Sequence, residues 1–520
     1  MACALRMEAS LGKMPEMRRA WSGLEKASWV AWVLLLLTLP ITSFPHFPAF
    51  LRLGDTLVRP LGLYPLGLLL LIDVGPAILL GWKPGRLFSP AIAFAVVASL
   101  LTVLNLLEPS LPFRGQEPVG RALRAGATLL VGFGFLLATL RMTRTKERLL
   151  ASVHWLLAGM GIATVWGLAQ GSRIFFGWPY YSHLNPIQRL ISIRDLFPGR
   201  ISGLTYEPSW FADQLLGLAL PFLIAAPLTG YRLFTKRWPG RVIEWAFLGG
   251  ALLALLLTYS RGGLVTLGVA VAVGGMILAA ERWGGMARWL RAGNGGGGSA
   301  PGRWTRALGR VAIFLGVVVG LILVIGWFGS RNPYFALLWT QFRLLRDPTA
   351  YLLLVGAGTR LALLAASWSL FLQHPWIGVG LGQSGFQLLD HLPGYAYNRI
   401  EEITFLVAPS SNLLPNPKNL WVRLLAETGI VGTLLFVVFV LMVLVAALAL
   451  MRKRDAWARY LGTAGMMSWL AVVVQGFSLD SFALPTMWVS FGIVGSAAVL
   501  LLEGRQRAPG ESRLSMSPSA

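Results

Sequence analysis

The stretch Thr433–Leu450, TLLFVVFVLMVLVAALAL, contains no charged residue. A second uncharged run extends from Val311 to Phe328. A run of about 18 or more apolar residues predicts a transmembrane helix, because about 20 helical residues span the hydrocarbon core. These runs are continuous and do not alternate as barrel strands do, and a helix satisfies its own backbone polar groups in lipid. The two stretches therefore predict an all-α fold, a polytopic transmembrane helix bundle.

The composition of the whole chain agrees with this prediction. The 520 residues are 55% hydrophobic and only 13% charged, whereas soluble domains carry roughly 25% charged residues. Applying the same criterion along the chain predicts about twelve spans, at 27–44, 61–82, 87–107, 120–140, 149–171, 209–230, 242–260, 262–281, 309–329, 425–451, 460–478 and 483–502.

The basic residues predict how the spans are oriented. Most lysines and arginines fall in every second gap between spans, as the cluster Arg452, Lys453 and Arg454 does. Cytoplasmic loops carry such an excess of basic residues, so both termini are expected in the cytoplasm. The net charge of +23 is attributed to these topology signals, and nucleic acid is not an expected partner.

Three regions follow from this topology. Residues 1–329 form spans one to nine, with an outer loop at 172–208 and a cytoplasmic loop at 282–308, where Gly293–Gly302 (GNGGGGSAPG) predicts a flexible linker. Residues 330–424 form a large outer loop, and 425–520 form the last three spans and a cytoplasmic tail. The apolar segment 361–372 is too short to be a clear span, and is expected to lie at the membrane surface, to fold back over the bundle or to be re-entrant.

Several classes of chemistry lack their sequence signals. No Walker loop is present, and no GxGxxG motif opens a helix after a strand, which argues against an ATP-driven pump. Cys3 is the only cysteine, so neither an intramolecular disulfide nor a cysteine metal site is expected. No two of the five histidines stand at metal-ligand spacing, and no metal or other cofactor is predicted.

The outer loops contain more arginine than the topology rule predicts. Arginine at the outer boundary favours an anionic partner, because guanidinium binds phosphate bidentately and stays charged. The alternative is headgroup anchoring and local ion pairs with nearby acids. The basic residues concerned are Arg173, Arg189, Arg194, Arg200, Arg261, Arg331, Arg343, Arg346, Arg360, Arg399, Lys418 and Arg423.

Four short motifs occur in order between residues 200 and 435. The first is Arg200–Ala212, RISGLTYEPSWFA, and the second is Ser260–Gly263, SRGG. Thr359-Arg360 then precedes His374–Gly382, HPWIGVGLG, and NPKNLWVRLLAETGIVG follows at Asn416–Gly432. In this order, and within a multi-span chain with a large late outer loop, the motifs resemble the O-antigen ligase and O-antigen polymerase superfamily.

The resemblance implies a metal-independent membrane glycosyltransferase on the outer face of the bacterial inner membrane. Such enzymes take a glycan from undecaprenyl diphosphate and join it to an acceptor glycolipid. Polymerases extend another lipid-linked repeat unit, whereas ligases transfer to lipid A-core. The partners implied are the undecaprenyl-diphosphate-linked glycan, the acceptor glycolipid, membrane lipids and a chain-length regulator protein.

The resemblance also implies roles for individual residues. Arg200, Arg261 and Arg360 match the motif arginines and are expected to contact the diphosphate or the glycan. Arg261, Arg360 and Glu207 form the predicted catalytic set. Glu207 stands at the mouth of a span, where a carboxylate is costly, and is interpreted either as the general base or as the partner of an arginine. The expected substrate-binding residues are Arg200, Tyr206, Lys418, Asn419, Arg423 and His391.

One departure from the family pattern tilts the prediction toward a polymerase. Ligases carry His-Asn where this chain has Lys418-Asn419, and a lysine is a poor base but a good phosphate contact. His391, upstream in the same loop, is a minor candidate for a spatial substitute of the missing histidine. The glycines of HPWIGVGLG are interpreted as a tight turn rather than as a phosphate-binding run. A lipid-linked oligosaccharide transporter remains an alternative, although the two halves of the chain show no repeat.

Overall fold

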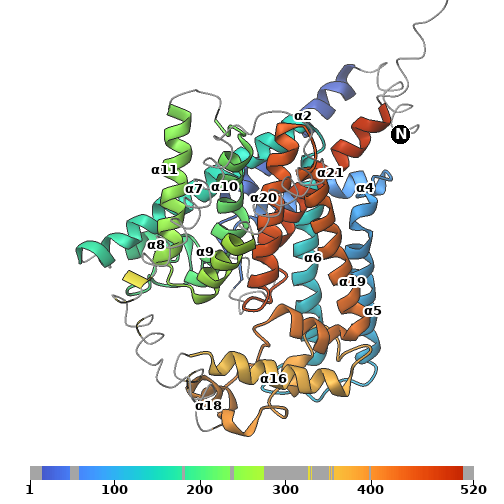
Figure 1. Ribbon diagram of the computed structural model, residues 1–520. Coiled ribbons are helices and arrows are strands. Elements are labelled where there is room, and N and C mark those ends of the chain that lie inside the picture. The colour runs from blue at the N-terminus through green and yellow to red at the C-terminus, as the bar shows by residue number, and fades with distance from the viewer. Residues whose placement is uncertain are drawn as a thin grey trace, which may run out of the picture.

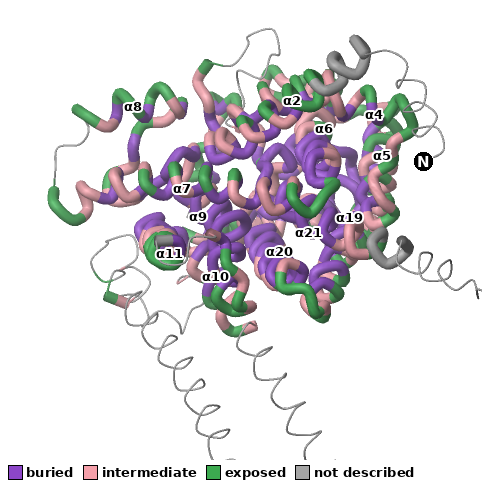
Figure 2. The backbone as a smooth tube through the Cα atoms, turned by 90° about the horizontal axis from the view of Figure 1, so that it is seen from above, coloured by how far each residue is buried: buried purple, intermediate pink, exposed green. Residues whose placement is uncertain are grey.

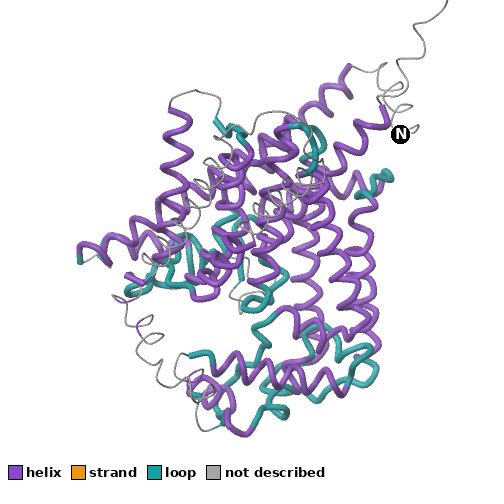
Figure 3. The backbone as a smooth tube through the Cα atoms, viewed as in Figure 1, coloured by secondary structure: helices purple, strands orange, loops and turns teal. Residues whose placement is uncertain are grey.

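The protein is described here by a computed structural model that covers residues 15–46, 58–177, 182–234, 239–273, 356–397 and 400–507, with single residues 326, 327, 330, 336, 351 and 353. Every regular element in these ranges is a helix, and no strand occurs in them (Figure 3). This confirms the predicted helical bundle. The predicted span 309–329, the loop 282–308 and the arginines at 331, 343, 346 and 399 lie almost wholly outside the described residues.

The first part of the chain contributes α2 (Pro15–Thr38), α3 (Leu63–Leu69), η2 (Leu70–Val74), α4 (Gly75–Leu79), η3 (Arg86–Phe88), α5 (Ser89–Asn105), α6 (Pro118–Met142), α7 (Lys146–Phe176), α8 (Leu184–Ile191), α9 (Pro208–Gln214), η4 (Leu215–Ala219), α10 (Leu220–Thr229) and α11 (Pro239–Leu257). The second part contributes α16 (Gly358–Gln373), α17 (Ser384–Gln387), η6 (Gly394–Ala396), α18 (Glu401–Val407), α19 (Leu420–Met451), α20 (Ala456–Gln475) and α21 (Pro485–Arg507).

Seven described helices are long and apolar enough to cross a membrane: Arg86–Asn105, Pro118–Met142, Lys146–Phe176, Pro208–Thr229, Gly240–Leu257, Leu420–Met451 and Pro485–Leu502. Two shorter apolar helices, Leu63–Leu79 and Arg261–Val273, coincide with further predicted spans. The chain is therefore a multi-pass membrane protein. The full number of spans and the side of each terminus stay predictions.

The helix Pro208–Thr229 lies at the centre of the bundle. In its most apolar stretch 83% of the residues are buried, against 33% for Arg86–Asn105 at the periphery. Figure 2, which looks down on the bundle, shows the same gradient, with buried residues concentrated in α9, α10 and α20 and exposed ones in α5 and α8. The motif that leads into α9 therefore enters the bundle close to its axis.

One end of the bundle is covered by the helices between α16 and α18. Figure 1 shows α16 running across the lower end of α5, α6 and α19, and we call this the capped end. The cap has its own apolar core, in which Leu363 and Leu370 of α16 pack with Leu388, Ile403 and other residues. Ala426 of α19 belongs to the same core, so the cap is packed onto the bundle.

A break in α19 joins the cap to the bundle. Gly429 has φ +61° and ψ −165°, a conformation that only glycine adopts readily, and it interrupts the helix. The carbonyl oxygens of Ala426 and Glu427 accept hydrogen bonds from the amides of Val379 and Gly380, at 3.0 and 2.8 Å.

The amides on the other side of the break find partners in the same turn. Ile430 donates to the carbonyl oxygen of Pro375 at 2.8 Å, and Val431 donates to that of Trp376 at 3.3 Å. HPWIGVGLG and LLAETGIVG are therefore two halves of one backbone joint. Gly378, Gly380 and Gly382 all have positive φ in this turn, as their interpretation as a tight turn requires.

The predicted span 61–82 is less regular than its hydropathy implies. It contains the π-helical turn Leu70–Val74 between α3 and α4. Asp73, within that turn, pairs with Nε of Arg141 on α6 at 2.5 Å. The π turn widens the helix locally and directs this acid toward a neighbouring helix.

We expect Gly429→Ala to destabilise the protein by at least ~2 kcal/mol, because this conformation is costly for any residue with a Cβ. A Cβ built on Gly429 would also lie 2.2 Å from the Trp376 carbonyl oxygen. Thermal unfolding in detergent measures the effect. The control is Gly126→Ala in α6, where a Cβ would meet nothing within 4 Å. Equal melting temperatures for the two variants would contradict the proposed joint.

Candidate functional site

Five cations from distant segments are connected by contacts at the capped end. Arg200 precedes α9, Arg261 follows α11, and Arg360 lies in the first turn of α16. Lys418 and Arg423 flank the start of α19. We call these five residues the cation cluster; the sequence had predicted all of them as site residues.

Arg200 holds the backbone next to Arg261. Its Nε donates to the carbonyl oxygen of Thr258 at 2.9 Å, and its Nη2 to that of Tyr259 at 3.3 Å. Arg261 itself reaches the segment that leads into α16, since a Cβ built on Gly356 would lie 3.9 Å from its Nη1. The arginines of the first two motifs are therefore joined through the end of α11.

Arg360 links the cap to the loop between α20 and α21. Its Nη1 donates to the carbonyl oxygen of Ser478 at 2.8 Å and to that of Lys418 at 3.4 Å. Both acceptors are neutral, and Arg360 forms no ion pair with any residue in the described part of the chain. Its exposed guanidinium therefore keeps a charge that no directly contacting acid neutralises.

Lys418 is paired with an acid of the cap. Its ammonium donates to the carboxylate of Glu402 on α18. Partial burial acts to raise the pKa of Glu402, but the hydrogen bond and charge of Lys418 outweigh it and hold that pKa below its ordinary value. A lysine is a poor base but a good contact for an anion, and Lys418 already pairs with the Glu402 carboxylate.

Arg423 is built into the bundle. Its side chain is only 12% exposed, and its Nε donates to Oε2 of Glu427 at 3.0 Å. Its Nη1 donates to the carbonyl oxygen of Asp480 at 2.7 Å. Glu427 in turn accepts from Oγ of Ser384 at 2.8 Å, so this pair ties α19 to α17 and to the α20–α21 loop just before the break at Gly429.

Asn419 occupies the N-cap of α19. Its side-chain oxygen accepts from the amides of Trp421 at 3.0 Å and Val422 at 3.2 Å. An N-cap satisfies amides that the first helical turn leaves without partners. The predicted role of Asn419 in substrate binding stays untested, and its side-chain oxygen is already engaged in starting the helix.

Glu207 and Tyr206 belong to a neighbouring group at the mouth of α9. Oε1 of Glu207 lies 3.3 Å from Nη1 of Arg194, and its Oε2 accepts from Oγ of Ser209 at 3.1 Å. The Arg194 guanidinium lies 5.0 Å from the Tyr206 ring centre, and Tyr206 packs on Trp210. Of the two roles expected for Glu207, the structure shows the arginine partner directly.

His391 lies in the cap, beyond α17. Its Nδ1 is 2.9 Å from the carbonyl oxygen of Gln387, whose side-chain amide donates to Oγ of Ser110 at 3.4 Å. These contacts tie His391 to the connection between α5 and α6, whereas Lys418 contacts Glu402 and Arg360. No hydrogen bond or ion pair among the described residues joins His391 to Lys418, the position at which ligases carry their histidine.

The sequence analysis missed Asp480, in the loop between α20 and α21. The loop accepts hydrogen bonds from both Arg360 and Arg423. Burial raises the pKa of the Asp480 carboxyl above its ordinary value, although the charge of Arg423 opposes this shift. A lone acid in a short turn between two apolar spans is the signal that identifies it.

Asp480 borders a small cavity whose wall is mainly apolar. The cavity has a volume of about 40 Å³ and is also lined by Asp213 and Gln475. Oδ2 of Asp480 and Nε2 of Gln475 are buried, with no hydrogen-bond partner in the described ranges. A cavity of this size admits a hydroxyl group. In those ranges no three His, Cys, Asp or Glu side chains are arranged to hold a metal ion.

The Lys418–Glu402 pair predicts a pH-dependent effect of Lys418→Met. Because the folded pKa of Glu402 is lowered, the pair stabilises the fold above the unfolded pKa of about 4.5, and this contribution is lost as pH falls through the folded pKa. The difference in melting temperature between wild type and variant should therefore be largest near neutral pH and shrink below about pH 4. The pair is half exposed, so we expect about 0.2–1 kcal/mol. A difference in melting temperature that does not change with pH would contradict the pairing. So would an equally large effect of Lys418→Met in protein that already carries Glu402→Gln.

Comparison with known proteins supports the resemblance carried by the motifs. Residues 246–437 match the model of the O-antigen ligase family, Wzy_C. The matched segment includes Arg261, Arg360, Lys418 and Arg423 and ends before Asp480. No curated protein matches the chain. Together with the ordered motifs and the helical membrane bundle, this match supports the O-antigen polymerase and ligase superfamily.

Proposed function

We propose that the chain is an O-antigen or polysaccharide polymerase. It transfers a glycan from undecaprenyl diphosphate to the non-reducing end of another lipid-linked repeat unit. The observation that carries this proposal is the convergence of Arg200, Arg261 and Arg360 at the capped end, from segments far apart in the sequence. Two of these arginines lie within the segment that matches the O-antigen ligase family.

The chemistry of the donor fits arginine. As the bond from the anomeric carbon to the diphosphate breaks, negative charge accumulates on the leaving diphosphate. Preorganised guanidinium groups stabilise such charge without reorganising at the moment of reaction. Arg360 is held by carbonyl oxygens and is exposed, so its charge is available to an anion approaching from the membrane boundary.

The acceptor hydroxyl must lose a proton as it attacks, so a nearby carboxylate is useful. We propose Asp480 for this role ahead of Glu207. Asp480 lines a cavity beside the cation cluster and its Oδ2 has no hydrogen-bond partner in the described ranges, whereas both carboxylate oxygens of Glu207 are engaged by Arg194 and Ser209. Its raised pKa makes the Asp480 carboxylate a stronger base than an exposed aspartate.

The state of Lys418 favours polymerisation over ligation. In this superfamily the ligases are expected to have a histidine base at this position, and the Lys418 ammonium is instead paired with Glu402. Ligation to lipid A-core is the second candidate function, and the specific observation in its favour is the match to a family described as O-antigen ligase.

The test is a reaction with purified protein and one undecaprenyl-diphosphate-linked oligosaccharide repeat, without nucleotide and with EDTA. A ladder of products from this single substrate supports the polymerase. Transfer of one unit only after lipid A-core is added supports the ligase. If a folded sample transfers nothing under either condition with the cognate repeat, glycosyl transfer is the wrong function and transport becomes the better candidate.

In this assay Arg360→Gln should lower turnover by about 100-fold or more, because it removes a donor aimed at the leaving group. The matched control is Arg189→Gln, which removes an exposed arginine that pairs with Asp195 outside the cation cluster. Turnover of the control should stay within about twofold of wild type. Equal losses for both variants would argue against a specific role for Arg360.

Asp480→Asn should lower turnover by about 100-fold or more, while Glu207→Gln causes a smaller loss. A base acts when deprotonated, so wild-type activity should fall as pH falls through an apparent pKa above the ordinary value of 3.8. The residual activity of Asp480→Asn should lack that decline, and Asp480→Glu should restore part of the rate. If Glu207→Gln lowered turnover more, and Asp480→Asn kept the wild-type pH profile, Glu207 would be the general base.

A further inference from the structure

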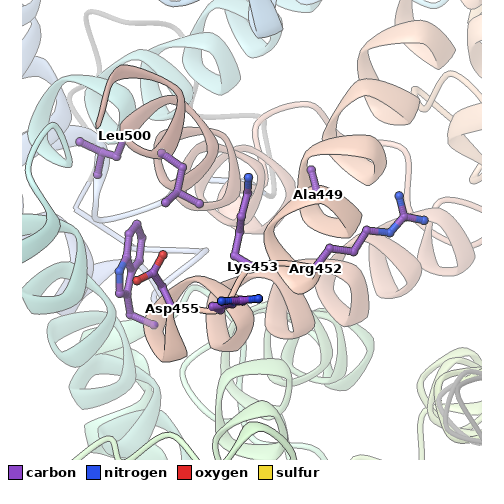
Figure 4. A pocket seen from close by; sticks show the side chains of 8 residues that line it. Ala449, Arg452, Lys453, Asp455 and Leu500 are labelled. Atoms are coloured by element: carbon purple, nitrogen blue, oxygen red, sulfur yellow. The ribbon is translucent and has the colours of Figure 1, made fainter. Parts of the chain in front are cut away.

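A second cavity lies at the end of the bundle opposite to the cap. It has a volume of about 920 Å³ and opens where α19 ends, α20 begins and α21 approaches its C-terminus. Its rim includes three successive cations, Arg452, Lys453 and Arg454. Figure 4 shows the Lys453 side chain between Leu500 and Arg452, with Arg452 directed away from Asp455. Nothing in the proposed glycosyl transfer uses this cavity.

The cavity carries a net positive charge. Asp455 is the single acid among the described side chains that line it. None of the three rim cations forms an ion pair with another described side chain. A fourth cation lies near one of the lining residues, since Nζ of Lys146 is 5.7 Å from the ring centre of Trp457. The cavity is therefore suited to an anion with more than one negatively charged oxygen.

The rest of the wall is apolar. Leu500 and Leu501 of α21 and Ala449 of α19 line the cavity next to the cations. Trp457 also lines the cavity, together with the cations and the leucines. Tryptophan is common at the boundary between a bilayer and water. A cationic rim over an apolar wall matches a molecule with a phosphate joined to hydrocarbon, and the volume falls in the range of about 300–1,000 Å³ of ligand sites.

We propose that this cavity binds an anionic phospholipid of the adjacent leaflet. The three rim cations contact its phosphate, and the leucines of α21 contact the glycerol and the first acyl carbons. A lipid fits better than a soluble phosphate for two reasons. The cavity opens at the ends of membrane-crossing helices, and half of the residues that line it are apolar. Basic pockets between helices on the cytoplasmic side are suited to anionic headgroups.

The test uses full-length protein purified in neutral detergent and given an equimolar mixture of phosphatidylglycerol and phosphatidylcholine. Native mass spectrometry measures which lipid is retained, and wild type should retain phosphatidylglycerol selectively. Arg452→Gln combined with Lys453→Gln should weaken that retention by roughly 30-fold, since each cation near an anionic surface contributes about a fivefold effect. Retention that does not distinguish the two lipids would overturn the proposal.

The matched control removes two charges elsewhere at the same end of the bundle. Arg232→Gln combined with Arg241→Gln changes two exposed arginines, one just after α10 and one in the first turn of α11. It should leave phosphatidylglycerol retention unchanged. Equal losses in both double variants would show a diffuse effect of net charge and would overturn the site.

Two measurements on the wild-type protein do not depend on any variant folding. A photoreactive phosphatidylglycerol with its diazirine near the headgroup should label peptides that contain residues 449–457 or 500–501. Labelling confined to other peptides would overturn the proposal. Inorganic phosphate at the same concentration should not displace the lipid; displacement would identify a general anion site in place of a lipid site.

Discussion

The exchange of backbone hydrogen bonds across the break at Gly429 is the constraint on which the capped end depends. A broken helix leaves amides and carbonyls without partners, which is costly in a membrane protein. Here the turn at His374–Gly382 supplies those partners from outside the helix. The cap that carries Arg360 is thereby fixed to the helix that carries Arg423, and the glycines of both motifs are required by close backbone approach.

The cations at the capped end are held in two ways. Lys418 and Arg423 pair with Glu402 and Glu427, so their charge is largely balanced where they stand. Arg360 donates to carbonyl oxygens, which position its guanidinium without cancelling its charge. The charges of Lys418 and Arg423 are thus neutralised by neighbouring carboxylates, whereas Arg360 keeps its positive charge. Preorganised positive charge of this kind favours a transition state in which a diphosphate departs.

Much of the fold could be predicted, because hydrophobic runs and basic turns are local features of the sequence. The pairing of Asp73 with Arg141 could not, since hydropathy does not reveal the π-helical turn that directs Asp73. Asn419 illustrates a signal that was present and assigned to another role: a polar residue directly before a long apolar run is also an N-cap signal. Asp480 was missed for a different reason. Its neighbours Arg360 and Arg423 are distant in the sequence, and only the folded bundle brings the three together.

The loop between α20 and α21 also determines when the site is completed during synthesis. Arg360 and Arg423 both donate to carbonyl oxygens of this loop, and the amide of Leu420 donates to that of Gly476 at 2.7 Å. A nascent chain that has inserted α19 already contains the whole segment that matches the family, yet the carbonyl acceptors of Ser478, Asp480 and Gly476 are absent until the last helical hairpin has been made. The hairpin α20–α21 therefore acts as a closing element, and incompletely synthesised chains carry the arginines without the arrangement that makes them a site.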